Sequence, residues 1–499
     1  MDAIGCQTYV RHTHGDTSQT DLLLADPDLT ATQLRASLEE ISGAILQQEA
    51  LLSELRSKQQ EFERRLGLVV YPVLTLPNEI ISRIFVYCLP SHGRVRPTLQ
   101  EAPLLLAQIC RHWRVIALET CELWSSVDPN FKRTRKGIQS LLESWFSRGK
   151  EHPLSLTLRT DEITFPFPVG AIIHTVAHRL WRLELCLDDM SDVELANNHT
   201  GFPNLRQLAV LRKIPSSPNN HPILLGFSDA PLLSELKIHG DPGLPNLDLY
   251  PLLTNLEVHN IPATILHSIL QQLPQLLHVT ARLEQTTNTI RGPVTIAPSL
   301  QSFVLWGPCS NILKSLTLPG LRRLELHTSD RHSSRPDFFR RSACALDHLA
   351  IALDQGMDEL ADCLHAVPTV TSLVIRVIDD DMYSLACALR ATPLPVPRLA
   401  NLVIRVTTPS PDFKYYPLVR ALEVRAAHGL VSVQIHSFQR FWQEDGWLPP
   451  AGCLDELTTL IADGMDVELR CDDEYSWNGR DGPYETQYIG YSDPGETFP

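Results

Sequence analysis

The chain has 499 residues, 43% of them hydrophobic, and a formal net charge of −15. At a prior of about 150 residues per domain, this length allows roughly two to four domains, each with a sizeable core. The acidic balance argues against a general nucleic-acid binder and against a protein that binds anionic membranes.

The eleven cysteines are scattered singly, with no CxxC pair. This pattern indicates reduced thiols in a cytoplasmic or nuclear protein, and neither a disulfide framework nor a zinc site. No apolar run reaches the roughly 18 residues that span a bilayer. Residues 1–10 also lack the basic and apolar regions of a secretory signal. We therefore expect an intracellular chain with no membrane partner.

Residues 31–68 carry the spacing of a coiled-coil helix, after a polar segment, residues 1–30, that we predict to be disordered. Apolar residues recur at alternating steps of four and three, with no intervening Pro. The seam consists of Leu34, Leu38, Ile41, Ile45, Gln48, Leu52, Leu55, Gln59, Phe62 and Leu66. The two Gln residues weaken it. Self-association through this helix and a single amphipathic helix lying on its own domain therefore both stay open.

Residues 73–128 predict three short helices. Pro77 suits the first helical position, where its missing N–H would be unpaired anyway, and Glu79 suits the first turn. The apolar face of this first helix consists of Ile80, Ile81, Ile84, Phe85 and Leu89. After a loop from Pro90 to Pro103, a second helix is predicted over residues 104–118. Its apolar positions are Leu106, Ile109, Trp113, Ile116 and Ala117, and Leu123-Trp124 follow.

Residues 129–153 are predicted to be a linker that contains a basic cluster, residues 132–136, and then a helix. The basic cluster suits a nuclear-localisation signal, but with only four basic residues the linker interpretation is preferred.

Residues 154–462 contain an internal repeat. A Pro is followed by apolar residues two, five and seven positions later, at spacings of about 20–29 residues, the range of leucine-rich repeats. The copies begin at Pro203, Pro231, Pro251, Pro274, Pro298, Pro319, Pro368, Pro397 and Pro417, and two copies without the Pro begin at Leu180 and Leu346. Each copy predicts a short strand in a common parallel sheet. Unrelated buried strands in an ordinary α/β domain are the alternative.

The last segment, residues 463–499, is acidic and interspersed with tyrosines, and we predict a flexible tail. No nucleotide-binding loop, HExxH metal motif or nucleophile-elbow motif occurs in the chain. His12 and His14 have no neighbouring ligands at metal-site spacing. The other histidines, including His239, His259 and His327, fall near predicted strand ends. We therefore expect no enzymatic activity, no cofactor and no metal.

The three helices of residues 73–128 resemble an F-box. The family pattern LP-x-E, then C-x-x-W-R-x-I-A, then L-W is carried here by Leu76 to Glu79, Cys110 to Ala117 and Leu123-Trp124. Together with the repeats, the chain is similar to F-box proteins with a leucine-rich-repeat-like C-terminal domain, in particular to the fungal F-box-like family. The implied fold is α+β with repeats: a coiled-coil helix, a three-helix F-box module and an irregular leucine-rich-repeat-like α/β solenoid.

The resemblance implies that the chain binds a Skp-type adaptor, and through it a cullin-RING complex. The residues that match the family's adaptor-facing positions are Leu76, Pro77, Ile80, Ile84, Ile109 and Trp113. The resemblance also implies that Ile109, Trp113 and Leu123-Trp124 hold the module together. The repeats would then bind a protein substrate whose identity the sequence does not give. Two alternatives stay open: a scaffold without ligase activity, and a helical module that only caps the repeats.

Overall fold

The structure, a computed structural model, describes residues 30–67, 72–91, 93–129, 137–159, 169–187, 201–212, 227, 229–239, 250–285, 290, 292–327, 334–353, 360–377, 382–406, 415–437, 451–471, 475–477 and 487–488. These residues form two compact units, Met1–Ile81 and Ser82–Pro499. The predicted disorder of residues 1–29 and the basic cluster at 132–136 lie outside the described residues.

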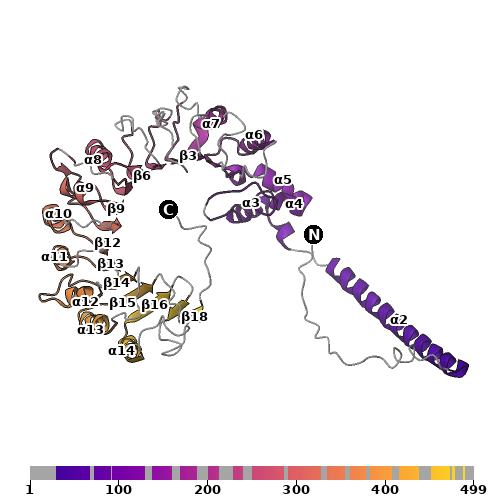
Figure 1. Cartoon of the computed structure of the whole chain (residues 1–499). Helices are drawn as coiled ribbons and strands as arrows, with labels where there is room; N and C mark the ends of the chain where they lie inside the picture. The colour runs from indigo at the N-terminus through magenta and orange to yellow at the C-terminus, as the bar shows by residue number, and fades with distance from the viewer. Residues whose placement is uncertain are drawn as a thin grey trace. The chain divides into compact units, whose positions relative to one another are not determined.

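The first unit is dominated by one long helix, α2 (Ala31–Gly67), followed by the short 3₁₀ helix η1 (Pro72–Thr75). Figure 1 shows α2 as one uninterrupted helix. The predicted helix over residues 31–68 is therefore confirmed. Its seam is exposed: Leu38, Ile45 and Phe62 keep 64%, 52% and 68% of their surface. The described part of the chain therefore does not cover this seam.

The helical segment after η1 begins with α3 (Asn78–Tyr87), directly after Pro77. The second predicted helix is wrong in one respect, because it is divided into α4 (Leu106–Ile109) and α5 (Arg111–Glu119). Cys110, between them, is extended (φ −153°, ψ 168°), and its Sγ accepts the backbone N–H of Trp113 as an N-cap. The Leu123-Trp124 pair lies in a single 3₁₀ turn, η2 (Cys121–Trp124), and not in a third α-helix.

The rest of the second unit is a mixed α/β structure built on a large parallel sheet. The sheet has 16 strands, and β1 to β16, apart from β8 and β10, follow one another in chain order and are parallel. The strands are β1 (Ser126–Val127), β2 (Leu154–Arg159), β3 (Leu180–Leu187), β4 (Gln207–Arg212), β5 (Glu235–His239), β6 (Asn255–Ile261), β7 (His278–Leu283), β9 (Ser302–Trp306), β11 (Arg323–His327), β12 (His348–Leu353), β13 (Ser372–Val377), β14 (Asn401–Val406), β15 (Ser432–Ser437) and β16 (Asp466–Cys471). The strands β17 (Tyr475–Trp477) and β18 (Gln487–Tyr488) continue this sheet antiparallel. A separate pair joins β8 (Thr295–Ile296) to β10 (Leu316–Thr317).

Helices cover one face of this sheet. They are α6 (Ile138–Arg148), α7 (Val169–Val176), η3 (Ala177–Arg179), α8 (Ala263–Gln272), α9 (Ser310–Lys314), α10 (Arg335–Ser342), α11 (Leu360–His365), α12 (Met382–Arg390), α13 (Tyr415–Ala426) and α14 (Ala451–Ala462). In Figure 1, α8 to α14 follow the outer side of the strands. Side chains alternate across a strand, so the two apolar positions of each strand, such as Leu324 and Leu326, are buried towards the helices. We call the opposite side the open face.

The structure corrects two predictions in this region. The copy of the repeat at Pro417 is not a strand, because Pro417 lies in the first turn of α13, where a missing N–H is tolerated. The strand nearby is β15, whose buried Val433 and Ile435 have no preceding Pro. Residues 466–471, which were predicted to belong to a flexible tail, are instead the strand β16, with Val467 and Leu469 in the core.

The described helices include none that is both long and apolar enough to cross a bilayer. The described cysteines that form no disulfide are Cys88, Cys110, Cys121, Cys309, Cys344, Cys363, Cys387 and Cys453.

Candidate functional site

The helix α3 has one buried and one exposed apolar face. Ile81 and Phe85 are fully buried, whereas Ile80 and Ile84 keep 48% and 40% of their surface. These two exposed residues are one turn apart and therefore share a face of the helix. Pro77 starts the helix by accepting the N–H groups of Ile80 and Ile81 with its carbonyl, at 3.0 and 3.1 Å. Leu76, just before it, is 36% exposed.

The other two predicted site residues differ in their surroundings. Ile109, at the end of α4, is 55% exposed, so the prediction that it holds the module together is wrong. It stands on the outside because the break at Cys110 ends the helix there and turns the chain. Trp113 is half-buried and packs against Phe85, with ring centroids 4.9 Å apart and planes at 60°. Its indole Nε1 is buried without a hydrogen-bond partner.

A well-packed core supports the part of the helical segment that lies in the second unit. Leu123 and Trp124 are fully buried, and Trp124 Nε1 donates to the carbonyl of Ala117 at 2.8 Å. Thr120 Oγ1 donates to Ser82 Oγ at 3.0 Å, which joins the end of α5 to the second half of α3. Ile84 and Ile109, in the second unit, are therefore exposed although the segment around them is well packed.

The end of this segment continues directly into the sheet. Trp124 packs edge-on against Trp145 of α6 with ring centroids 4.7 Å apart, and Trp145 Nε1 donates to the Ser126 carbonyl of β1 at 3.0 Å. The long loop before α4 is fixed as well. Arg94 donates to both oxygens of the buried Glu184 on β3, each at 3.0 Å.

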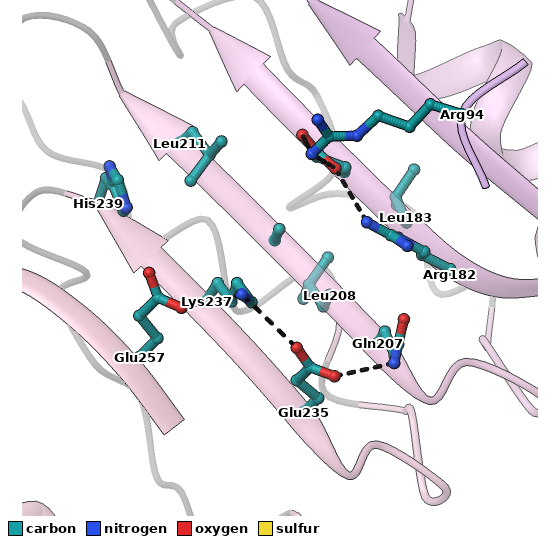
Figure 2. Close-up of a pocket in the computed structure, with 12 residues that line it drawn as sticks. Arg94, Arg182, Leu183, Gln207, Leu208, Leu211, Glu235, Lys237, His239 and Glu257 are labelled. Atoms are coloured by element: carbon teal, nitrogen blue, oxygen red, sulfur yellow. Dashed lines mark hydrogen bonds and ion pairs between the residues drawn. The ribbon is translucent and has the colours of Figure 1, made fainter. Parts of the chain in front are cut away.

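The open face of β3 to β6 is lined by polar side chains at the positions between the buried leucines (Figure 2). Gln207 Nε2 donates to Glu235 at 2.8 Å, and Lys237 lies 3.8 Å from Glu235 and 2.9 Å from Glu257. These polar positions lie between the leucines of the sequence repeat, but the repeat alone does not show that polar residues of different copies are neighbours. Only the strand register makes residues on different repeats neighbours.

One group on this face has the residue types of a metal site. The ligand atoms of His239, Glu257 and His259 lie within 4.8 Å of one another. The hydrogen bond to His259 at 3.1 Å is the main cause that lowers the pKa of Glu257 to about 2, and burial lowers the pKa of His239 to about 4. The ammonium of Lys237 already neutralises the same carboxylate, and the two imidazole rings stack at 3.8 Å. We therefore interpret the group as an ion-pair and stacking network.

Comparison with models of known protein families gives no match for this chain, and comparison with curated proteins gives none either. The functional argument therefore depends on the residues and the geometry described above.

Proposed function

We propose that this chain is the substrate-recognition subunit of a Skp-cullin-F-box ubiquitin ligase. One observation carries the proposal: α3 follows a Leu-Pro pair and leaves Ile80 and Ile84 exposed, although Ile81 and Phe85 on the same helix are fully buried. Apolar side chains held in water on a rigid helix are typical of a surface that binds a partner. The partner we propose is a Skp-type adaptor.

In this proposal residues 73–128 form an F-box-like module, and the parallel sheet with its helices is an irregular leucine-rich-repeat-like solenoid. The exposed Ile109 of α4 joins Leu76, Pro77, Ile80 and Ile84 as an adaptor-contacting residue. Trp113 acts differently: its packing against Phe85 positions α5 relative to the second half of α3.

The chain supplies no chemical step in this mechanism. It binds the adaptor with the helical module and a protein substrate with the sheet. Holding both raises the effective concentration of substrate lysines near the ubiquitin-charged enzyme that the cullin-RING complex recruits. The rate then depends on geometry and on the lifetime of the two complexes, and not on an acid, base or nucleophile of this chain.

A scaffold without ligase activity is the second candidate, and the exposed seam of α2 favours it. Leu34, Leu38, Leu52 and Leu55 keep half or more of their surface, so α2 has an unsatisfied apolar stripe of its own. The cap interpretation has weaker support. The helical segment contacts the sheet and its helices through Trp124, Arg94 and β1, whereas Ile80 and Ile84 on the outer face of α3 are exposed.

The test is capture of a purified Skp-type adaptor by the full chain and by a Leu76→Ala, Pro77→Ala variant. We expect the wild type to bind and the variant to lose binding. A Leu99→Ala variant is the matched control, because Leu99 is 65% exposed but lies in the loop before α4. Absence of binding by the folded wild type would overturn the proposal. Capture of the adaptor without the cullin would favour the scaffold.

A further inference from the structure

One row of residues on the open face consists mainly of Arg and His. It consists of the last open-face position of ten consecutive strands of the sheet, from β5 to β16: His239, His259, Arg282, Trp306, His327, Ala352, Arg376, Arg405, His436 and Arg470. We call it the cationic row. Eight of its ten members are Arg or His, although the chain has only 43 Lys and Arg and 19 His in 499 residues and a net charge of −15. Such an enrichment at one structural position indicates a shared role.

The first half of the cationic row is a ladder of stacked planar groups. The rings of His239 and His259 stack with centroids 3.8 Å apart, and Trp306 and His327 stack at 3.8 Å with planes at 17°. Between these two pairs, the guanidinium of Arg282 lies 5.6 Å from the centre of the Trp306 ring. Arg and Trp are the residue types that contribute most to binding energy at protein interfaces.

In the second half of the row, the positive charges are those of Arg376, Arg405 and Arg470. The register neighbours of Arg405 are Arg376 on β13 and His436 on β15, and adjacent strands lie about 4.8 Å apart. The Nε of Arg405 is buried and has no hydrogen-bond partner, and no described carboxylate forms an ion pair with this residue. A buried guanidinium N–H without a hydrogen-bond partner is costly unless a ligand supplies an acceptor, and a carboxylate is the strongest one.

An apolar strip runs alongside these charges. The preceding open-face positions of β12, β13 and β14 are Ala350, Val374 and Val403, which are register neighbours. The open-face positions of β12 to β15 include no acidic residue. A ligand for this surface therefore needs anionic groups for the row and apolar groups for the strip.

We propose that the cationic row binds an extended acidic segment of the protein substrate, with apolar side chains between its carboxylates. The inference rests on the proposed function and names the substrate's chemistry. The apolar side chains of a peptide fit the half-buried Val374 and Val403, next to the buried Ala350, whereas the phosphodiester backbone of a nucleic acid has no apolar groups to place there. On β6, β11 and β16 the open-face position before the row holds Glu257, Glu325 and Glu468. These carboxylates would repel a polyanion that ran along the whole row, but a short acidic segment on β12 to β15 does not meet them.

The chain's own acidic residues are weaker candidates. Two parts of the acidic segment, β17 and β18, already extend the sheet beyond β16. Arg376 and His436 already have interactions of their own within the chain. Arg405, on the strand between them, is therefore the residue on which the proposal depends.

Fluorescence anisotropy of the full chain with a labelled synthetic peptide tests this proposal. The peptide alternates Glu with Val and Tyr, and the control peptide has Gln in place of Glu. We expect the Glu peptide to bind, and its affinity to fall as ionic strength rises from about 0.05 M to about 0.2 M. Arg405→Gln should weaken binding about tenfold and the Arg282→Gln, Arg405→Gln pair about a hundredfold, as for charged hydrogen bonds.

Arg340→Gln is the matched control variant. It removes the same charge from α10, where Arg340 is 69% exposed and paired with Asp337 at 2.9 Å. It should leave peptide affinity unchanged, and melting temperatures should show that all variants are folded. Equal binding of the Glu and Gln peptides, or equal loss from Arg340→Gln and Arg405→Gln, would overturn the proposal. So would tighter binding of a labelled single-stranded oligonucleotide.

The two proposals fail in different ways. If the chain binds the adaptor but does not bind the acidic peptide, the cationic row is not a peptide site, and the proposed ligase function is unaffected. A chain that binds the acidic peptide through Arg405 but never binds a Skp-type adaptor would keep the row as a peptide site and overturn the ligase assignment.

Discussion

Substitutions on the two faces of α3 should have opposite effects. A change on the exposed face should weaken adaptor binding and leave stability unchanged, whereas a change on the buried face should lower stability. The first variant, Ile80→Ser, Ile84→Ser, changes the exposed face. The second, Ile81→Ala, changes a residue with no exposed surface. Ser and Ile have similar helix propensities, so the first variant should leave α3 and the unfolding free energy almost unchanged. The second leaves a cavity and should lower the free energy of unfolding by about 2–5 kcal/mol.

The expected loss of adaptor affinity follows from the surface that is still exposed. Complete burial of an Ile side chain is worth about 1.5–3 kcal/mol. With 48% and 40% of their surface accessible, Ile80 and Ile84 would each gain about 1 kcal/mol on docking. Removal of both should therefore cost about 2 kcal/mol, which is roughly a 30-fold increase in the Kd for the adaptor.

Two measurements decide the matter: calorimetric titration with purified Skp-type adaptor, and urea unfolding of each variant. If the Ile80→Ser, Ile84→Ser variant unfolds as easily as Ile81→Ala, the outer face of α3 is packed in solution and the module is a cap. If it keeps both its stability and the wild-type Kd, the adaptor does not use this face, and the proposed docking helix is wrong.

Three further predictions follow from other described contacts. Leu38→Asp, Leu52→Asp places charges in the exposed seam of α2, and light scattering should show an oligomer reduced to a monomer; a monomeric wild type would refute self-association. Arg94→Met removes the bidentate partner of the buried Glu184, and since Arg94 is 38% exposed, urea unfolding should show a loss of only about 1–2 kcal/mol; unchanged stability would contradict this. The third concerns pH. Burial lowers the pKa of His239 from its ordinary 6.5 to about 4, so the folded state favours the neutral ring. The resulting stability is present above about pH 6.5 and is lost progressively as the pH falls towards 4, with about 2 kcal/mol lost by about pH 5. His239→Gln should flatten this part of the stability profile, and an unchanged profile would assign the acid sensitivity to another group.

The sequence predicted the long helix and most strands because both depend on short-range patterns. The seam of α2 and the buried pairs such as Leu324 and Leu326 follow directly from helical and strand periodicity. Pro417 misled the prediction because the spacing of Val419 and Leu422 also fits one face of a helix, and a Pro in the first turn does not prevent one. The break at Cys110 was missed because a cysteine seldom caps a helix.

The open face was not predicted, since its chemistry depends on register. In the sequence, Arg376, Arg405 and His436 are separated by whole repeats and follow strands of ordinary composition. Only the parallel pairing of β13, β14 and β15 places them side by side. The earlier interpretation of the histidines as strand-end residues was right about their position, but it gave no reason to consider them together. Listing the last polar position of each repeat would have revealed the basic bias.

The two proposed interactions of the chain should respond differently to salt. Docking through Ile80 and Ile84 depends on apolar burial, which added salt does not weaken. Binding at Arg282 and Arg405 depends on charges that are partly exposed, and these are screened within a Debye length of about 8 Å at physiological ionic strength. A salt titration of the complex with both partners should therefore release the acidic peptide first and keep the adaptor bound. Simultaneous release would mean that one of the two surfaces has been assigned the wrong chemistry.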